Sequence, residues 1–496
     1  MNTVANSKSG QQEELINQAA RSFKWSILYN AAPRLITPFS TMILAALLTP
    51  ADFGLVALST SVMALAAILV DLGLGKAVVQ NRTKVEEFAS ISMWLSLIMS
   101  FGIYLIIWIA TPLISELYHN VQVINIIRVS AISLPLSALT TVPKGLLRRE
   151  MKFNRLFWVN SSFLITQAIA SVIFAWLGAG AWAIIWGQLL GILVSSVFVW
   201  AAIKWRPSFV WNWPIVKEQL RFSLWIMLSS LQNWLLLYAD NIIAGIFLGI
   251  YSLGVYSLGL HIAILFPVFV VAALNDVAYP AFCKLQGNAR AVGKSLIGLQ
   301  RLTGALLFPI AFGISSIASP VIELLYGNKW EGLGTVISLL VIMPGLSSIW
   351  TLNESSYLSV GKPAIYTKLS AMSIILLLPL LWTAAPYGLI TFTVARFTGA
   401  LLLPLGNVVF GARSLELKIS DQIKPLFLPF LAGCLMFVVV CLATAQLQPF
   451  SGLLGWTKLL LLIALGTIVY ATIIRLVSKD LWEDLFTGVK RVFLHR

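Results

Sequence analysis

The sequence is poor in the residues with which soluble enzymes do their chemistry. Only 11% of its 496 residues are charged, and it has 3 His and 3 Cys, whereas soluble domains carry about 25% charged residues. Two of the cysteines, Cys434 and Cys441, fall in one apolar segment, so no disulfide framework or metal cluster is indicated. An HExxH motif, a Gly-rich loop followed by Lys-Ser/Thr and a large acidic outer loop are all missing. We therefore expect no enzyme, no metal site and no cofactor.

Hydrophobic residues make up 59% of the chain, and the mean hydropathy is +0.89. This composition predicts an all-α integral membrane protein, because helices satisfy their own backbone hydrogen bonds inside a bilayer. The net charge of +15 would suggest nucleic acid in a soluble protein. Here the positive residues fall in short loops, so we expect membrane lipids and no nucleic acid as partners.

The organising stretch is a predicted transmembrane hairpin over residues 25–80. Two apolar segments, each long enough to cross a bilayer, flank the turn TPADFG. In this turn Thr49 is a candidate N-cap, Pro50 a first helical residue and Asp52 a first-turn acid. The turn therefore predicts that a helix begins there.

The hairpin is repeated 200 residues later, over residues 225–280. Trp25 and Gly54 correspond to Trp225 and Gly254. Further on, LISELYHN at 113–120 resembles VIELLYGN at 321–328. The repeat predicts two six-span halves of the same orientation, related by an axis along the membrane normal, with a site between them.

We predict about fourteen transmembrane helices. Residues 1–24 form a cytoplasmic amphipathic segment, 25–203 an N-lobe with spans 1–6, and 204–411 a C-lobe with spans 7–12. Residues 412–496 add spans 13 and 14 and a cytoplasmic tail. The predicted spans are 25–48, 54–75, 89–113, 123–143, 157–177, 182–203, 222–248, 253–281, 302–321, 333–355, 369–384, 389–411, 425–445 and 456–475.

Positive charge orients these spans. With the N-terminus inside, 29 of the 34 Lys and Arg residues fall in inner segments, and Lys329 is the only one in an outer loop. Inner loops carry the excess of Lys and Arg in membrane proteins. Both termini are therefore predicted to be cytoplasmic.

Four charged residues inside spans are the candidate substrate-binding residues, because intramembrane charges are costly and mark sites. Arg34 lies deep in the first span beside Pro33; the alternative is an Arg that caps a proline bend. Arg128 and Arg396 lie nearer the outer ends of their spans and could instead snorkel to headgroups. Asp240 could pair with an Arg, bind a coupling cation or form a structural ion pair.

The segment LLTPADFGLVALSTSVMALAAILVDLGLGKAVVQ resembles the first hairpin of the polysaccharide transporters. These are Wzx-type flippases of the multidrug/oligosaccharidyl-lipid/polysaccharide exporter (MOP) superfamily, and the resemblance is strongest to the colanic-acid and teichuronic-acid exporter branch. It implies a MATE-like fold of two lobes around an alternately opening cavity. It also implies transport of a polyprenyl-pyrophosphate-linked oligosaccharide across the bacterial inner membrane, with a polysaccharide polymerase and chain-length machinery as further partners.

The physical logic agrees with this resemblance. A hydrated, anionic head group does not pass through hydrocarbon unaided, and Arg offers an always-charged, bidentate partner for phosphate. The alternatives are a cation-coupled multidrug exporter and a peptidoglycan lipid-precursor flippase of the same superfamily. Neighbouring glycosyltransferase and polymerase genes would favour the first interpretation.

Overall fold

The structure is a computed structural model that describes residues 33, 36–80, 84–210, 212–362, 364–447, 450 and 452–487. The described residues form helices joined by short turns, and they contain no β-strand. Two compact units, residues 1–246 and 247–496, are each described by themselves. The division between them falls within one long helix, α9 (Trp213–Lys284).

Twelve helices in the described part of the chain are long and apolar enough to cross a membrane. Their outer surface is apolar as well. On α4 (Val85–Leu117) Ile109 is 75% exposed, and Leu105 and Leu113 are exposed beside it. An exposed apolar surface of this extent marks contact with a membrane. The predicted all-α integral membrane fold is confirmed.

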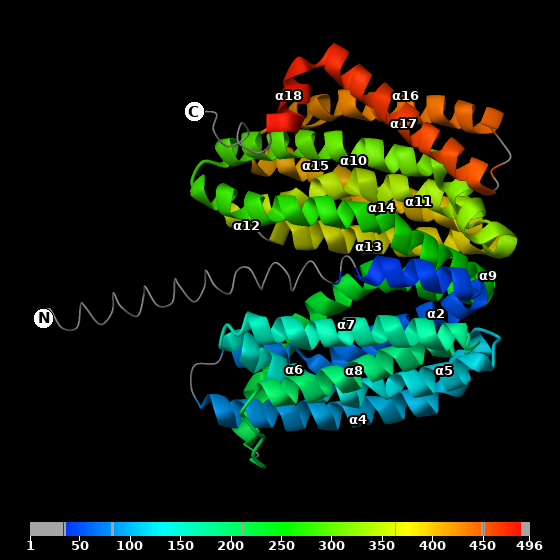
Figure 1. The fold of residues 1–496 in the computed structure, drawn as a ribbon. Coiled ribbons are helices and arrows are strands. Elements are labelled where there is room, and N and C mark those ends of the chain that lie inside the picture. The colour runs from blue at the N-terminus through cyan, green and yellow to red at the C-terminus, as the bar shows by residue number, and fades with distance from the viewer. Residues whose placement is uncertain are drawn as a thin grey trace, which may run out of the picture. The chain divides into compact units, whose positions relative to one another are not determined.

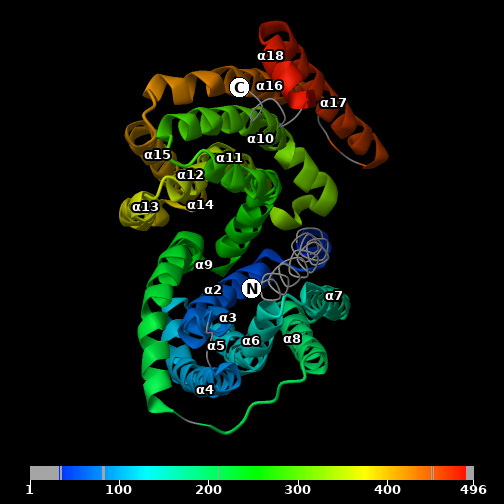
Figure 2. The ribbon, with the colours of Figure 1, turned by 90° about the vertical axis from the view of Figure 1, so that its left-hand side faces the viewer.

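The N-terminal unit is a bundle of closely packed helices (Figure 1). α7 packs along α8, and α2 packs against α5 and α6, as the nearly end-on view of Figure 2 shows. A further apolar helix covers Ile36–Leu47. The labelled helices of this unit, besides α4 and the first part of α9, are α2 (Pro50–Asp71), α3 (Leu74–Gln80), α5 (Gln122–Ala131), α6 (Ser133–Arg149), α7 (Phe153–Trp176) and α8 (Trp182–Ala202).

The start of α2 has the cap that its sequence predicts. The backbone N–H of Thr49 donates to Asp52 Oδ2 at 2.9 Å, and the N–H of Asp52 donates to Thr49 Oγ1 at 3.3 Å. This reciprocal pair is a capping box, with Pro50 at the first helical position. Asp52 Oδ1 also accepts from the N–H of Ala181 at 2.8 Å. One carboxylate therefore ties the start of α2 to the turn between α7 and α8.

The long helix α9 (Trp213–Lys284) comprises two helices joined at Gly249. Gly249 has φ 79° and ψ 171°, a conformation that is open essentially to glycine alone. The break falls at the turn predicted between spans 7 and 8. The first part of α9 packs on α2, where the indole N–H of Trp234 donates to the carbonyl of Ser61 at 3.0 Å.

The C-terminal unit is built around α10, which lies between α11 and α16. Phe308 and Phe312 of α10 meet Phe430 and Phe437 of α16 edge to face. The hydroxyl of Tyr470 on α17 donates to the carbonyl of Ala305 at 2.9 Å. Besides the second part of α9, the helices of this unit are α10 (Ala289–Tyr326), η1 (Gly327–Trp330), α11 (Leu333–Ser347), η2 (Ser348–Thr351), α12 (Leu352–Ser359), α13 (Ala364–Ala384), η3 (Ala385–Tyr387), α14 (Leu389–Ala400), α15 (Leu402–Ser414), α16 (Ile419–Leu447), α17 (Gly452–Val477) and α18 (Lys479–Thr487).

The predicted spans coincide with these helices, apart from shifts at their ends. One apolar segment, Ile226–Val271, has 46 residues and includes the Gly249 break, so it covers two predicted spans. The beginning of the first predicted span, with Arg34, lies outside the described residues. The division into lobes at residues 203 and 204 stays a prediction.

Candidate functional site

A cavity of about 280 Å³ follows α2 within the N-terminal unit. It is lined by α2 on one side and by α5, α6 and α8 on the other, from Val56 to Asp71 on α2. At 1.5 Å per residue this stretch of α2 is about 22 Å long, against roughly 30 Å for the hydrocarbon core of a bilayer. The cavity therefore extends along most of a transmembrane helix.

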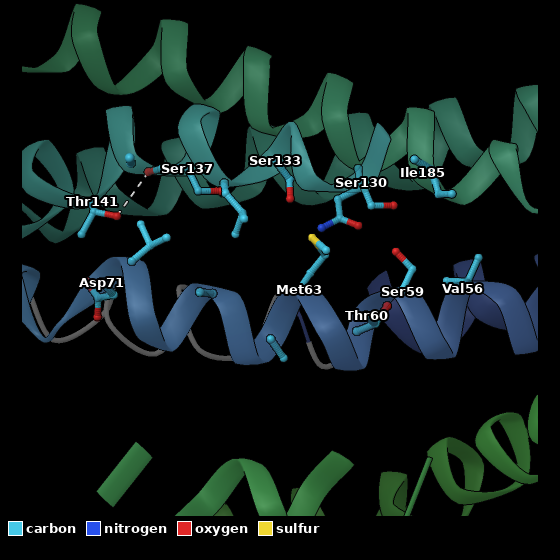
Figure 3. A pocket seen from close by; sticks show the side chains of 16 residues that line it. Val56, Ser59, Thr60, Met63, Asp71, Ser130, Ser133, Ser137, Thr141 and Ile185 are labelled. Carbon is cyan, nitrogen blue, oxygen red and sulfur yellow. Dashed lines mark hydrogen bonds between the residues drawn. The ribbon is translucent and has the colours of Figure 1, made fainter. Parts of the chain in front are cut away.

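Hydroxyl groups dominate the polar lining, and we call this cavity the hydroxyl groove. Figure 3 shows Ser59 and Met63 of α2 facing Ser130 and Ser133 across it. The hydroxyl residues that line the groove are Ser59, Thr60, Ser130, Ser133, Ser137 and Thr141.

The spacing of these residues explains why they share a face. Ser130, Ser133, Ser137 and Thr141 are three or four residues apart, which places them one above another along a helix. α5 ends at Ala131 and α6 begins at Ser133, with Ile132 between them still in a helical conformation. The two helices therefore present one continuous row of hydroxyls to α2.

Three of the hydroxyl groups that line the groove are not hydrogen-bonded to other described residues. Ser59, Ser130 and Ser133 are 3%, 7% and 6% exposed, yet their hydroxyls make no hydrogen bond to another residue in the described part of the chain. Serines in apolar helices usually bond a carbonyl of the preceding turn, as Ser61 does to Ala57 at 2.8 Å. The free hydroxyls can donate to and accept from a molecule in the groove.

A second cavity, of about 260 Å³, lies beyond the groove along α2 and α5. It lies at the Pro50 end of α2 and is lined by Asp52, Gln122 and Asn125 and by the turn 178–182. By the predicted topology this is the outer end. Polar lining thus accompanies α2 from Asp52 to Asp71.

The groove carries little charge. Of the described residues that line it, Asp71 at the end of α2 is the charged one, and Gln188 of α8 adds a neutral amide. In the described residues, no three His, Cys, Asp or Glu side chains are placed to hold a metal ion. The groove is suited to hydrogen bonding with a neutral polar molecule.

Arg128 lies outside both cavities. Its Nε donates to Thr111 Oγ1 at 2.9 Å, and another guanidinium nitrogen donates to the carbonyl of Trp108 at 3.2 Å. The guanidinium also lies over the Trp108 ring, 4.4 Å from its centroid, which adds a cation–π attraction. These contacts join α5 to the C-terminal part of α4.

The other described candidates are also absent from the lining of the two cavities. Arg396 is nine-tenths buried on α14 in the C-terminal unit. Asp240 is 2% exposed on the first part of α9. Its neighbour Asn241 donates to Ser61 Oγ at 3.4 Å, and Ser61 is two residues from Ser59, on the opposite side of α2 from the groove. The substrate-binding roles of Arg34, Arg128, Arg396 and Asp240 stay predictions.

Reasoning from the sequence missed the groove because it searched for charge. The signal that was available is the spacing of Ser130, Ser133, Ser137 and Thr141, four hydroxyls on one helical face beside a second helix that carries Ser59. Asp71, at the end of α2, also lines the groove.

Comparison with known proteins identifies the family. A family model described as "Polysaccharide biosynthesis protein" matches residues 43–334. The chain is 23% identical to the teichuronic acid biosynthesis protein TuaB of Bacillus subtilis (strain 168), over 82% of this chain and 84% of that one. It is 26% identical to the succinoglycan biosynthesis transport protein ExoT of Rhizobium meliloti (strain 1021), over 66% of each.

A solved structure of the lipid II flippase MurJ, in an inward closed conformation, has the same fold. The TM-score is 0.74 at 14% identity, over 93% of this chain and all of that one. The resemblance predicted from the first hairpin is confirmed. The chain belongs to the polysaccharide biosynthesis protein family, with the fold of the MOP transporters.

Proposed function

We propose that this protein is a flippase for a polyprenyl-pyrophosphate-linked oligosaccharide. It moves the head group from the cytoplasmic to the outer leaflet of the bacterial inner membrane by alternating access. The product is the building block of a surface polysaccharide, such as a lipopolysaccharide O-antigen, an exopolysaccharide or a capsule. The protein carries out transport and no covalent chemistry.

The observation that carries this proposal is the polar lining along α2, from Asp52 to Asp71, in a member of this family. A sugar head group is strongly hydrated, and removing it from water without new hydrogen bonds costs several kcal/mol for each polar group. Hydroxyls and amides along a membrane-spanning helix replace those lost bonds. The lipid tail can meanwhile remain among other lipid tails.

Two named relatives support the transport step. ExoT is a transport protein of succinoglycan biosynthesis, and MurJ is a flippase for lipid II. We further propose that two six-helix lobes, residues 25–203 and 204–411, move against each other during transport. Both termini lie in the cytoplasm, where Lys and Arg are concentrated. A polysaccharide polymerase and chain-length machinery take over the product.

The proposal is tested in the bacterium that makes the protein. Depletion should abolish the surface polysaccharide and accumulate the lipid-linked oligosaccharide in the inner membrane, where a membrane-impermeant glycosidase added to spheroplasts does not reach it. Re-expression should reverse both effects. Normal polysaccharide after depletion would exclude this function.

The two alternatives give different results in the same cells. A multidrug exporter would change the efflux of a fluorescent organic cation and leave the polysaccharide intact. A peptidoglycan-precursor flippase would make the cells lyse on depletion. Each outcome would replace the proposed substrate with another.

A further inference from the structure

We infer that the hydroxyl groove binds an uncharged sugar unit of the substrate, and that the pyrophosphate binds elsewhere. This inference rests on the proposed function and deepens it by assigning one part of the substrate to one site. It draws on the lining of the groove, on the free hydroxyls and on the size of the cavity.

The described lining offers a pyrophosphate no cationic partner. A pyrophosphate needs Arg, Lys or a row of N–H donors when it leaves water. The described residues that line the groove include no Lys, Arg or His. The groove is therefore unfavourable for the charged part of the head group.

The same lining is favourable for a sugar. Each sugar hydroxyl is both a donor and an acceptor, and so is each serine hydroxyl, which rotates to suit its partner. Ser59, Ser130 and Ser133 are nine-tenths buried and have no hydrogen bond to a described residue. Met63 and Ile185 add apolar surface, against which the C–H face of a sugar ring can pack. This combination matches a ring with polar edges and apolar faces.

The size of the groove limits how much sugar it takes. Its volume of about 280 Å³ is just below the roughly 300–1,000 Å³ that is usual for small-molecule sites. The groove therefore takes about one sugar unit at a time. Because it extends along most of α2, successive positions of one sugar unit would mark a path from one end of the helix to the other.

The test compares two lipids that differ by one sugar. Purified protein in nanodiscs is titrated with undecaprenyl pyrophosphate and with undecaprenyl-pyrophosphoryl-glucose, and the apparent Kd of each is measured. The wild-type protein should bind the glucosyl lipid more tightly. The triple variant Ser59→Ala, Ser130→Ala, Ser133→Ala should bind the glucosyl lipid at least about tenfold more weakly, since each neutral hydrogen bond contributes about 1 kcal/mol. Its Kd for undecaprenyl pyrophosphate should stay unchanged.

A matched triple variant controls for the loss of any three buried serines. Ser92→Ala, Ser195→Ala, Ser196→Ala removes hydroxyls that donate to carbonyls of their own helices α4 and α8. This control should keep the wild-type preference for the glucosyl lipid. The variant Ser59→Thr, Ser130→Thr, Ser133→Thr retains the hydroxyls and should bind the glucosyl lipid more tightly than the alanine variant does.

The outcomes separate this inference from the proposed function. If the wild-type protein binds both lipids equally, or if the alanine variant loses both equally, the assignment of a sugar to the groove is wrong while the flippase proposal stands. A control variant that loses the preference as well would also overturn the assignment. If the wild-type protein binds neither lipid, the flippase proposal itself fails.

Discussion

At the scale of single residues, polar side chains within the spans differ in whether they already have partners. The guanidinium of Arg128 is held by Thr111 and by the ring and carbonyl of Trp108. The hydroxyls of Ser59 and Ser133 have no such bonds to the described residues. The charge of Arg128 makes it a candidate from the sequence alone. Only the packing of the helices distinguishes Ser59 and Ser133 from the other serines of the apolar helices. A serine in an apolar helix looks the same in sequence whether it bonds its own helix or faces a cavity.

Arg128→Ala should destabilise the N-terminal unit. The variant loses two hydrogen bonds and a cation–π contact between α5 and α4, which together contribute roughly 1–3 kcal/mol. We expect a lower thermal midpoint in detergent, measured by the fluorescence of the purified protein. The thermal midpoint of Arg128→Lys should lie between those of Arg128→Ala and the wild type, because an ammonium lacks the planar fork of a guanidinium. An unchanged midpoint in Arg128→Ala would contradict this. Export per molecule of inserted protein then tests the predicted substrate-binding role.

Arg34→Ala should abolish export while the protein remains inserted. Arg34 is a permanent positive charge in the first predicted span beside Pro33, and such charges inside a membrane mark functional sites. Arg34→Lys should restore export in part. Surface polysaccharide is measured against the amount of membrane-extracted protein. Full export per molecule in Arg34→Ala would assign this residue a structural role and transfer the predicted substrate-binding role to Arg128 and Arg396.

At the scale of helices, hydropathy locates the spans and misplaces their ends. The ninth predicted span begins at 302, but α10 begins at Ala289, because the helix continues through Arg290, Lys294 and Arg301. Hydropathy reports only the apolar part of a helix, whereas backbone hydrogen bonds continue the helix through its polar part. By contrast, the start of α2 was predicted to the residue, since Thr49 and Asp52 act locally. Local capping is readable from sequence, whereas the groove depends on how α2 packs against α6.

Asp52→Ala should weaken the N-terminal unit at the Pro50 end of α2. Asp52 accepts from the N–H groups of Thr49 and Ala181, so its loss removes half of the capping box and the link to the turn after α7. Loss of a helix cap costs about 0.5–2 kcal/mol. Hydrogen exchange at residues 50–56 and 178–182 should become faster. Asp421→Ala, an exposed first-turn acid on α16, serves as the control. Equal protection in Asp52→Ala and the wild type would show that the cap contributes nothing.

At the scale of the whole molecule, the class of the fold and the family could be predicted from the sequence, whereas the hydroxyl groove could not. The apolar composition and the spacing of Lys and Arg predict a multi-span protein with a defined orientation. The groove depends on residues of α2, α5, α6 and α8 that are distant in sequence. A candidate site made of uncharged hydroxyls leaves no motif, so it emerges only when these helices are seen together.

The predicted orientation is testable by labelling single cysteines in intact cells, in a variant whose three natural cysteines are replaced by serine. A membrane-impermeant maleimide should label Cys introduced at Gly180 and Gly452, and should reach Cys at Arg149, Lys294 and Arg413 only after the membrane is opened. The reason is that positive residues are retained on the cytoplasmic side. Labelling at Arg149 from outside would reverse the topology.

The most direct test of the central claim fills the hydroxyl groove. Ala67 lines the groove on α2, so the indole of Ala67→Trp should occupy the space through which the sugars pass. The control is Ile109→Trp on α4, where Ile109 is 75% exposed. This variant should transfer the oligosaccharide at the wild-type rate. Both variants are reconstituted into vesicles with a radiolabelled lipid-linked oligosaccharide, and transfer between leaflets is followed with a membrane-impermeant glycosidase. We predict that Ala67→Trp inserts normally and transfers no oligosaccharide; transfer at the wild-type rate would contradict the account.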